Sequence, residues 1–251
     1  MAHSVVIQNV SKAFSTTLAV DDFSLVLSEN SFVSIVGPSG CGKTTLLKMV
    51  AGLVLPSQGA ITVRGQPIEG PLRDIGIVFQ TPVLLPWRTT LGNILFVVEM
   101  GGRRTSDFRQ RAIELMHLAG LGGFEASYPH ELSGGMQQRA SICRAMLLKP
   151  PLILMDEPFG ALDVITRERM GFALQTLWDE SRSTVLFITH SISEAVLLSD
   201  FVVVMTPRPG RIRDIVPIDL PRPRYSETLR DPKFVELSAR VRDGIESSWS
   251  E

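Results

Sequence analysis

The chain has 251 residues, of which 44% are hydrophobic and 20% are charged, and its 25 lysines and arginines nearly balance its 26 aspartates and glutamates. This composition excludes an intrinsically disordered chain, because enough apolar surface is present to offset the entropy lost on folding. The formal net charge of −1 provides no overall positive field, so nucleic acid is not an expected partner.

Short apolar runs, many of them β-branched, alternate with helix-like segments along most of the chain. Residues 4–10 and 23–27 predict two strands of an antiparallel N-terminal ribbon. Most of the later runs are nearly continuously apolar, which is typical of strands buried on both faces. These further strands are expected at residues 32–36, 60–63, 75–79, 152–155, 184–188 and 201–205. The pattern predicts an α/β fold with a mostly parallel sheet.

The middle of the chain has a helical period instead, because apolar residues such as Phe108 and Ala112 recur about every three or four positions. We therefore predict a helical insertion at about residues 86–149. It would interrupt an α/β core made of about residues 1–85 and 150–205, so that the whole chain, residues 1–251, forms a single domain.

The remaining residues, about 206–251, are rich in proline and predict a tail that lies on the core and ends in a short helix. Basic residues gather between positions 208 and 224. We expect a solvated surface there, and a segment that binds a polyanion is the alternative.

Two cysteines, Cys41 and Cys143, are too few for a disulfide framework and indicate a reducing compartment. The N-terminus has no charged segment followed by an apolar core, so no signal peptide is expected. No uninterrupted apolar run approaches the roughly 18 residues that a membrane crossing needs. These features predict a soluble protein of the cytoplasm.

A phosphate-binding loop is predicted at residues 37–44, where the sequence Gly-Pro-Ser-Gly-Cys-Gly-Lys-Thr fits the pattern Gly, any four residues, Gly, Lys, then Ser or Thr. The loop follows an apolar strand and precedes a helix, as this motif requires. Its backbone amides and the helix N-terminus would surround phosphate oxygens. The residues expected to bind the nucleotide phosphates are Gly37, Pro38, Ser39, Gly40, Cys41, Gly42, Lys43, Thr44 and Thr45. Lys43 would reach the β- and γ-phosphates, and the Thr44 hydroxyl would bind Mg²⁺.

An acidic pair, Asp156 and Glu157, follows the apolar strand at residues 152–155. A carboxylate at the carboxyl end of such a strand lies beside the nucleotide loop in open α/β sheets. Asp156 would hold Mg²⁺, and Glu157, which points differently, would address the attacking water. A solvated strand end is the alternative for the acidic pair on its own.

A second glycine-rich helix start occurs at residues 132–139, Leu-Ser-Gly-Gly-Met-Gln-Gln-Arg. Ser133 sits at a cap position, and the helix is expected to open at Met136. This segment resembles the signature motif of ATP-binding cassette (ABC) proteins. In that family the phosphate loop of one subunit and the signature of another enclose each ATP. The resemblance implies that Ser133, Gly134, Gly135 and Gln137 act on ATP bound by a second subunit, in a homodimer.

Other residues fit the same family in chain order. Gln80 resembles the glutamine that touches Mg²⁺ and water and senses the membrane partner. Asp163 lies in a segment that resembles the loop of subunit contact, and His190 resembles the histidine that reaches the γ-phosphate. Phe14 takes the place of the aromatic residue that stacks on adenine, with a core position as its alternative. The family more often has Asp at the position of Ser191.

Residues 84–87, Leu-Leu-Pro-Trp, and the tail segments at 208–212 and 220–224 resemble the importer branch for nitrate, alkanesulfonates, taurine and bicarbonate. The resemblance implies an ATPase subunit at the cytoplasmic face of a bacterial-type inner membrane, with a permease and, indirectly, an extracytoplasmic solute-binding protein as partners. Trp87 would belong either to the core or a domain boundary, or to a groove that receives the permease. Alternatives are an importer for a pyrimidine-type vitamin precursor, an exporter, a soluble mechanical ABC ATPase and a nucleotide-binding regulator without catalysis.

Overall fold

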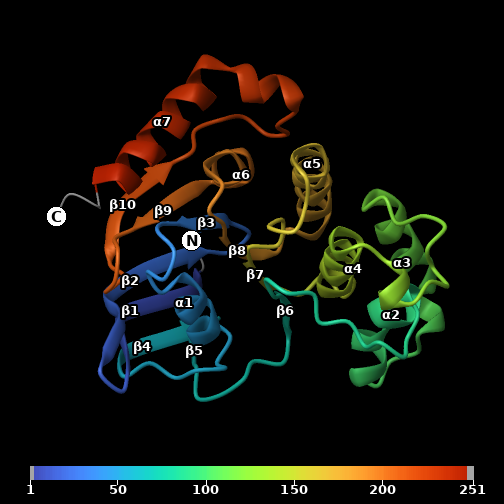
Figure 1. The fold of residues 1–251 in the computed structure, drawn as a ribbon. Coiled ribbons are helices and arrows are strands. Elements are labelled where there is room, and N and C mark those ends of the chain that lie inside the picture. The colour runs from blue at the N-terminus through green and yellow to red at the C-terminus, as the bar shows by residue number, and fades with distance from the viewer. Residues whose placement is uncertain (1–2, 248–251) are drawn as a thin grey trace.

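Two sheets and seven α-helices make up the computed structural model of the chain, which describes residues 3–247 (Figure 1). The first sheet has four antiparallel strands in the order β2-β1-β4-β5. These are β1 (His3–Phe14), β2 (Thr17–Ser28), β4 (Gln58–Val63) and β5 (Gln66–Pro67). β1 and β2 extend well beyond the two strands predicted from their apolar cores.

The second sheet has six strands in the order β10-β9-β3-β8-β7-β6. Its strands are β3 (Phe32–Val36), β6 (Ile75–Val78), β7 (Leu152–Asp156), β8 (Thr184–Ile188), β9 (Phe201–Met205) and β10 (Ile212–Pro217). All pairs are parallel except β10 with β9. The residues of β3, β7 and β8 are all buried, which explains why their sequences are nearly continuously apolar.

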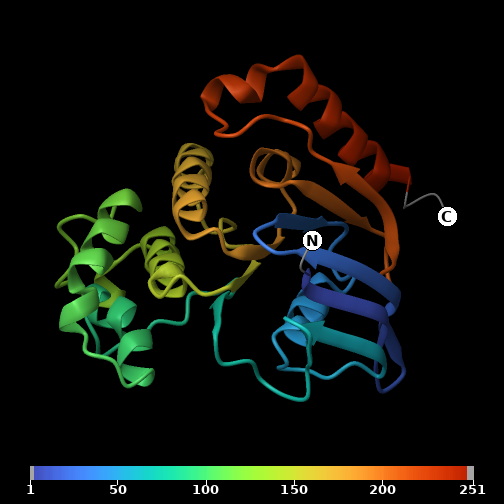
Figure 2. The same ribbon diagram turned by 180° about the vertical axis from the view of Figure 1, so that it is seen from behind.

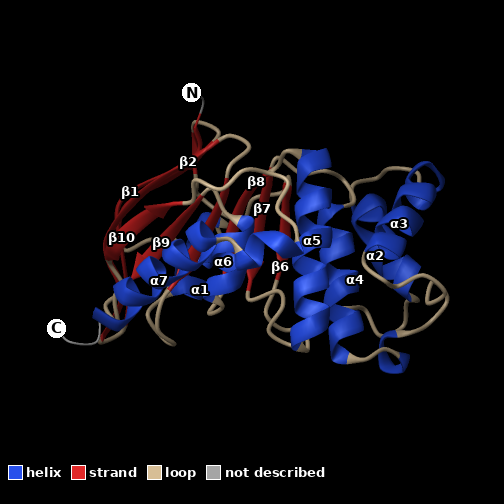
Figure 3. Cartoon of the chain, turned by 90° about the horizontal axis from the view of Figure 1, so that it is seen from above, coloured by secondary structure: helices blue, strands red, loops and turns tan. Residues whose placement is uncertain are grey.

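Helices surround this sheet and also form a separate cluster. α1 (Lys43–Val50), α5 (Val164–Ser181), α6 (Ile192–Leu198) and α7 (Pro232–Ser247) lie beside the strands. α2 (Thr90–Met100), α3 (Ser106–Leu118) and α4 (Gly134–Met146) gather on the far side of β6, away from the four-stranded sheet (Figure 3). The predicted α/β fold, with its antiparallel ribbon and its helical insertion, is therefore confirmed.

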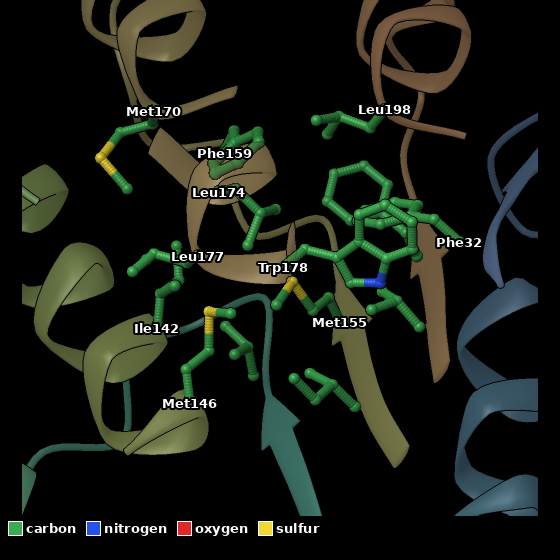
Figure 4. Packing of buried hydrophobic residues seen from close by; sticks show 14 of the residues in the cluster. Phe32, Ile142, Met146, Met155, Phe159, Met170, Leu174, Leu177, Trp178 and Leu198 are labelled. Atoms are coloured by element: carbon green, nitrogen blue, oxygen red, sulfur yellow. The ribbon is translucent and has the colours of Figure 1, made fainter. Parts of the chain in front are cut away.

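The larger hydrophobic core joins the second sheet to the helices that cover it. The Trp178 ring of α5 meets the Phe32 ring of β3 edge-on, with centroids 5.9 Å apart, and the Phe187 ring of β8 lies 5.6 Å from Phe32. Figure 4 shows Met155, Leu174 and Leu177 close to the same tryptophan. The Trp178 Nε1 donates to the Ser183 carbonyl at 2.7 Å, so this large ring is buried without an unsatisfied donor.

The C-terminal part differs from its prediction in two respects. It contributes an edge strand, β10, to the sheet, and its last helix, α7, spans 16 residues and is not short (Figure 2). The expected solvated basic surface is also wrong in part, because Arg224 is only 1% exposed. Its guanidinium donates to carbonyls at the end of α6.

The structure also shows the exposure of Trp87 and the state of the two cysteines. Trp87 is 71% exposed, so the core position considered for it is wrong. Cys41 and Cys143 are both free and buried. Among residues 3–247, no helix is both long enough and apolar enough to cross a membrane.

Candidate functional site: a phosphate loop beside three strand ends

The phosphate-binding loop connects β3 to α1. Gly42, immediately before α1, has a φ of 103°, and a Cβ there would lie 2.7 Å from the Ala19 carbonyl oxygen. Glycine is therefore required at this position for both conformation and space. The Lys43 Nζ donates to the carbonyls of Gly37 and Pro38, each at 2.8 Å, so its ammonium lies inside the curve of its own loop.

A pocket of about 540 Å³ opens beside this loop. Most of the predicted ATP-binding residues line it, whereas Gly37, Pro38 and Cys41 are buried within the loop. Phe14 lines the pocket and is 45% exposed, so the core position considered for it is wrong. The lining residues are Phe14, Thr17, Ala19, Ser39, Gly40, Gly42, Lys43, Thr44, Thr45, Gln80, Glu157 and Arg208.

Two oxygen-bearing side chains meet where α1 begins and β7 ends. The Thr44 hydroxyl donates to the Asp156 Oδ1 at 3.2 Å. Burial raises the pKa of Asp156 above the ordinary carboxyl value, an effect that the Thr44 hydrogen bond opposes and the nearby Glu157 carboxylate reinforces. The predicted Mg²⁺ ligands Thr44 and Asp156 are therefore adjacent.

Glu157 contacts the other two predicted catalytic residues, Gln80 and His190. Its Oε2 lies 3.2 Å from the Gln80 Nε2 and 3.2 Å from the His190 Nδ1. These residues follow β7, β6 and β8, which are neighbours in the sheet, so their carboxyl ends bring the side chains together. The backbone of Glu157 is left-handed, with a φ of 44°, a strained conformation of the kind found at functional sites.

The signature residues lie elsewhere in the chain. Ser133 caps α4 by accepting a hydrogen bond from the Met136 amide, as predicted, although the helix begins at Gly134 and not at Met136. Ser133 and Gly134 are exposed, whereas the Gln137 side chain turns back to donate to the Pro129 carbonyl at 2.9 Å. None of the four predicted signature residues lines the phosphate-loop pocket.

Two loops next to the site end in capped helices. Asp163 is exposed and caps α5, where the Thr166 amide donates to its carboxylate at 3.0 Å, and this hydrogen bond lowers the pKa of Asp163. Ser191 caps α6 by accepting from the Glu194 amide at 3.4 Å. The residue that differs from the family's usual Asp therefore still serves as a helix cap.

Thr17, Ala19 and Arg208 line the pocket, although sequence reasoning did not assign them to it. Thr17 and Ala19 belong to β2, which the apolar pattern predicted only from residue 23. Arg208 lies in the tail segment at 208–212, whose sequence resembles the importer branch of the ABC family. The sequence signals for it were the neighbouring glycine turn and the cluster of basic residues at 208–224, for which a segment that binds a polyanion was the alternative interpretation.

The fold and the pocket together define a nucleotide-binding protein of the P-loop class. The family model described as "ABC transporter" matches residues 20–160. The chain therefore belongs to the ABC transporter family, and it is an ATP-binding ATPase whose activity is coupled to transport.

Relatives with high coverage support this assignment. An uncharacterized ABC transporter ATP-binding protein of Methanocaldococcus jannaschii is 47% identical over 94% of this chain and 88% of its own length. The taurine import ATP-binding protein TauB of Rhizobium johnstonii is 43% identical over 93% of this chain and 91% of its own. The ATP-binding cassette MJ0796, solved as a dimer in a post-hydrolysis state with ADP and Pi, matches with a TM-score of 0.78 and 32% identity, covering 86% of this chain and 99% of that one.

Proposed function

We propose that this chain is the ATPase subunit of an importer for a small anion or sulfonate-bearing solute, of which taurine or a related alkanesulfonate is the first candidate and nitrate the second. The observation that carries the catalytic part of the proposal is the Glu157 carboxylate, which both Gln80 and His190 contact at 3.2 Å beside the phosphate loop. This arrangement would fix one carboxylate oxygen at the position where a water could attack ATP.

In the proposed reaction the loop amides and Lys43 hold the β- and γ-phosphates. Glu157 accepts a proton from the attacking water, whose oxygen forms a bond to the γ-phosphorus. The bond from that phosphorus to the oxygen bridging the β- and γ-phosphates breaks, leaving ADP and inorganic phosphate. His190, next to Glu157, would contact the γ-phosphate and align the water.

A magnesium ion fits the residues at the end of β7. Thr44 and Asp156 offer a hydroxyl and a carboxylate 3.2 Å apart, and Gln80 adds an amide oxygen on the neighbouring strand end. Hard oxygen ligands of this kind suit Mg²⁺, which takes its other ligands from phosphate and water. When bound, the ion would neutralise charge on the β- and γ-phosphates.

We further propose that two copies of the chain close on two ATP molecules. The exposed Ser133, Gly134 and Asp163 and their separation from the chain's own pocket favour an action on the nucleotide of a partner. The α4 N-terminus adds a positive dipole end where those phosphates would lie. The dimeric form of the similar cassette MJ0796 supports the same arrangement.

Coupling to a membrane permease would run through the Gln80 region. Gln138 of α4 donates to the Phe79 carbonyl at 2.9 Å, which ties the helical cluster to the residue before Gln80. Nearby, Val83 and Trp87 are large and exposed, as expected of a surface that receives a partner. The subunit would thus sit at the cytoplasmic face of the inner membrane and, through the permease, serve an extracytoplasmic solute-binding protein.

The Glu157→Gln variant tests the catalytic role. We expect ATP binding within about twofold of the wild type and a fall in phosphate release of about a hundredfold or more, since a general base contributes about that much. Glu236→Gln, an exposed site on α7, is the matched control. Phosphate release near the wild-type rate from Glu157→Gln would exclude Glu157 as the base.

Transport can be tested in cells that lack the chromosomal copy of this chain. We expect the wild-type chain, but not Glu157→Gln, to restore uptake of radiolabelled taurine, and a multi-span permease to co-purify with the tagged variant. Restoration of nitrate uptake alone would reassign the substrate, and recovery of only soluble partners would contradict the importer role.

A further inference from the structure

A tight turn at residues 206–211 follows β9 and holds its shape through its own hydrogen bonds. The Thr206 amide donates to the Arg211 carbonyl at 3.0 Å, and the Thr206 hydroxyl donates to the Pro209 carbonyl at 3.1 Å and accepts from the Arg211 amide at 3.0 Å. The Arg211 guanidinium also pairs with the Asp21 carboxylate of β2. Residues 206–211 are therefore a fixed part of the fold and not a loose start of the tail.

This turn lies directly against the phosphate loop and β2. The Gly210 amide donates to the Ala19 carbonyl at 3.0 Å, and the Asp21 amide donates to the Gly210 carbonyl at 3.1 Å. A Cβ on Gly210 would collide with the Cys41 carbonyl oxygen of the phosphate loop. Only glycine allows the backbone to approach the loop this closely. Arg208 is two positions before this contact in the sequence and is therefore held near the loop.

Arg208 uses this position to line the nucleotide pocket together with Phe14 and Thr17. Its side chain is exposed, and within residues 3–247 no carboxylate or carbonyl accepts a hydrogen bond from it. By contrast, Arg211 pairs with Asp21, and Arg222 pairs with Asp200. Arg208 thus presents an uncompensated guanidinium to the pocket.

The sheet order shows which end of the pocket this charge faces. β9, which leads to Arg208, lies on one side of β3, whereas β8, β7 and β6, which lead to His190, Glu157 and Gln80, lie on the other. The hydrogen bonds of Gly210 tie the turn to β2, whose hairpin with β1 carries Phe14. Arg208 therefore stands at the end of the pocket remote from the proposed catalytic group.

We propose that Arg208 is a nucleotide-binding residue that contacts the phosphates common to ATP and ADP, on the base-proximal side. A guanidinium presents several N–H donors in a planar fork that matches phosphate oxygens, and the pocket lining supplies only one other cation, Lys43. Because the contact is remote from Glu157, it strengthens binding and not the chemical step. The assignment depends on the nucleotide site proposed above.

Binding of ATP, ADP and adenosine to Arg208→Ala, measured by calorimetry with the full chain, tests the assignment. We expect the Kd for ATP and for ADP each to rise about tenfold, as for the loss of one charge-assisted hydrogen bond, and the Kd for adenosine to stay the same. In the ATPase assay KM should rise about as much while kcat changes less than twofold. Arg208→Lys should recover part of the affinity because it keeps the charge.

Two further variants separate this proposal from the site on which it depends. Arg242→Ala, an exposed change on α7, should leave all three affinities unchanged. Lys43→Ala should abolish ATP binding, and if it does not, the proposed nucleotide site itself is wrong. If Lys43→Ala abolishes binding while Arg208→Ala binds ATP and ADP within twofold of the wild type, only the Arg208 assignment fails. An equal loss for adenosine would overturn the phosphate contact, and unfolding curves matching the wild type confirm that each variant folds.

Discussion

Replacing Arg224 by alanine should destabilise the whole fold more than any other single change of a basic residue in the tail. Within residues 3–247 the buried guanidinium forms no ion pair, although Asp200 is near enough to act on its pKa, and it instead donates to backbone carbonyls at the C-terminus of α6 and in the segment after β10. Its Nη1 lies 2.9, 2.9 and 2.8 Å from the carbonyl oxygens of Val196, Leu197 and Ser199, and its Nη2 lies 3.1 Å from that of Leu220.

The magnitude follows from the four closest of the five carbonyls that would lose this donor, the fifth being the Ile218 carbonyl at 3.4 Å. Each buried acceptor left unsatisfied costs about 1 kcal/mol or more, so the alanine variant should lose about 4 kcal/mol of unfolding free energy. Burial lowers the pKa of Arg224 to about 10, with the neighbouring Arg222 adding to the effect, so the group remains charged at neutral pH. At about 2–4 °C per kcal/mol for a chain of this size, the melting temperature should fall by roughly 8–16 °C.

Urea unfolding followed by far-UV circular dichroism measures this loss directly. Arg240→Ala is the matched control, because Arg240 is exposed and its pair with Asp214 at 3.2 Å should contribute less than about 1 kcal/mol. Arg224→Lys should lie between the two, since an ammonium can donate to only some of the carbonyls. A loss below about 1 kcal/mol for Arg224→Ala would refute the view that these hydrogen bonds hold the segment.

Two other predictions concern buried titratable groups. Burial raises the pKa of the Cys41 thiol and raises that of the Cys143 thiol to about 12. Neither thiol should therefore react with a disulfide reagent at pH 7.5 in the folded chain, and both should react once urea unfolds it. A fast reaction of the folded chain would contradict this prediction. Burial also raises the pKa of Glu194, against the opposing hydrogen bond from Thr189. The charged or titratable groups acting on it are Arg167, His190 and Glu157. Because the folded state binds this proton more tightly, the stability of the wild type relative to Glu194→Gln should fall as the pH rises from about 4 to 7, and parallel stability curves would exclude the shift.

Nearly continuous apolar sequence predicted the buried strands well, since burial on both faces leaves few polar positions, such as Ser34 in β3 and Thr184 in β8. β3, β8 and β9 have the predicted bounds. The same signal fails at exposed edges: β2 alternates buried and exposed residues, and β10 presents Arg213 and Ile215 to solvent and ends at Pro217. The residue composition of edge strands of this kind is similar to that of loops, so composition alone does not identify them as strands.

The candidate site was predictable to the extent that it follows from strand order. Gln80 and His190 are 77 and 33 positions from Glu157, yet each follows a parallel strand, and the carboxyl ends of neighbouring strands converge. Arg208 was not predictable in this way, because its position depends on a turn that closes against the phosphate loop. The burial of Arg224 could not be predicted for another reason. Its partners are backbone carbonyls, which every residue has, so no residue type in the sequence marks them.

Polar contacts at both ends hold together α5 and α6, the helices that begin at the loops carrying Asp163 and His190, and the tail supplies the second of these contacts. The Arg167 guanidinium of α5 lies 3.5 Å from the Glu194 carboxylate of α6. At the opposite ends of the same helices, Gln175 exchanges hydrogen bonds with the Arg224 backbone at 2.8 and 3.1 Å, while the Arg224 side chain closes the end of α6. Because Arg224 contacts neither Glu157 nor the phosphate loop, an Arg224→Ala variant that still folds should retain the hydrogen bonds of the site itself. We therefore expect loss of stability and loss of catalysis to be separable in this chain, the former measured with Arg224→Ala and the latter with Glu157→Gln.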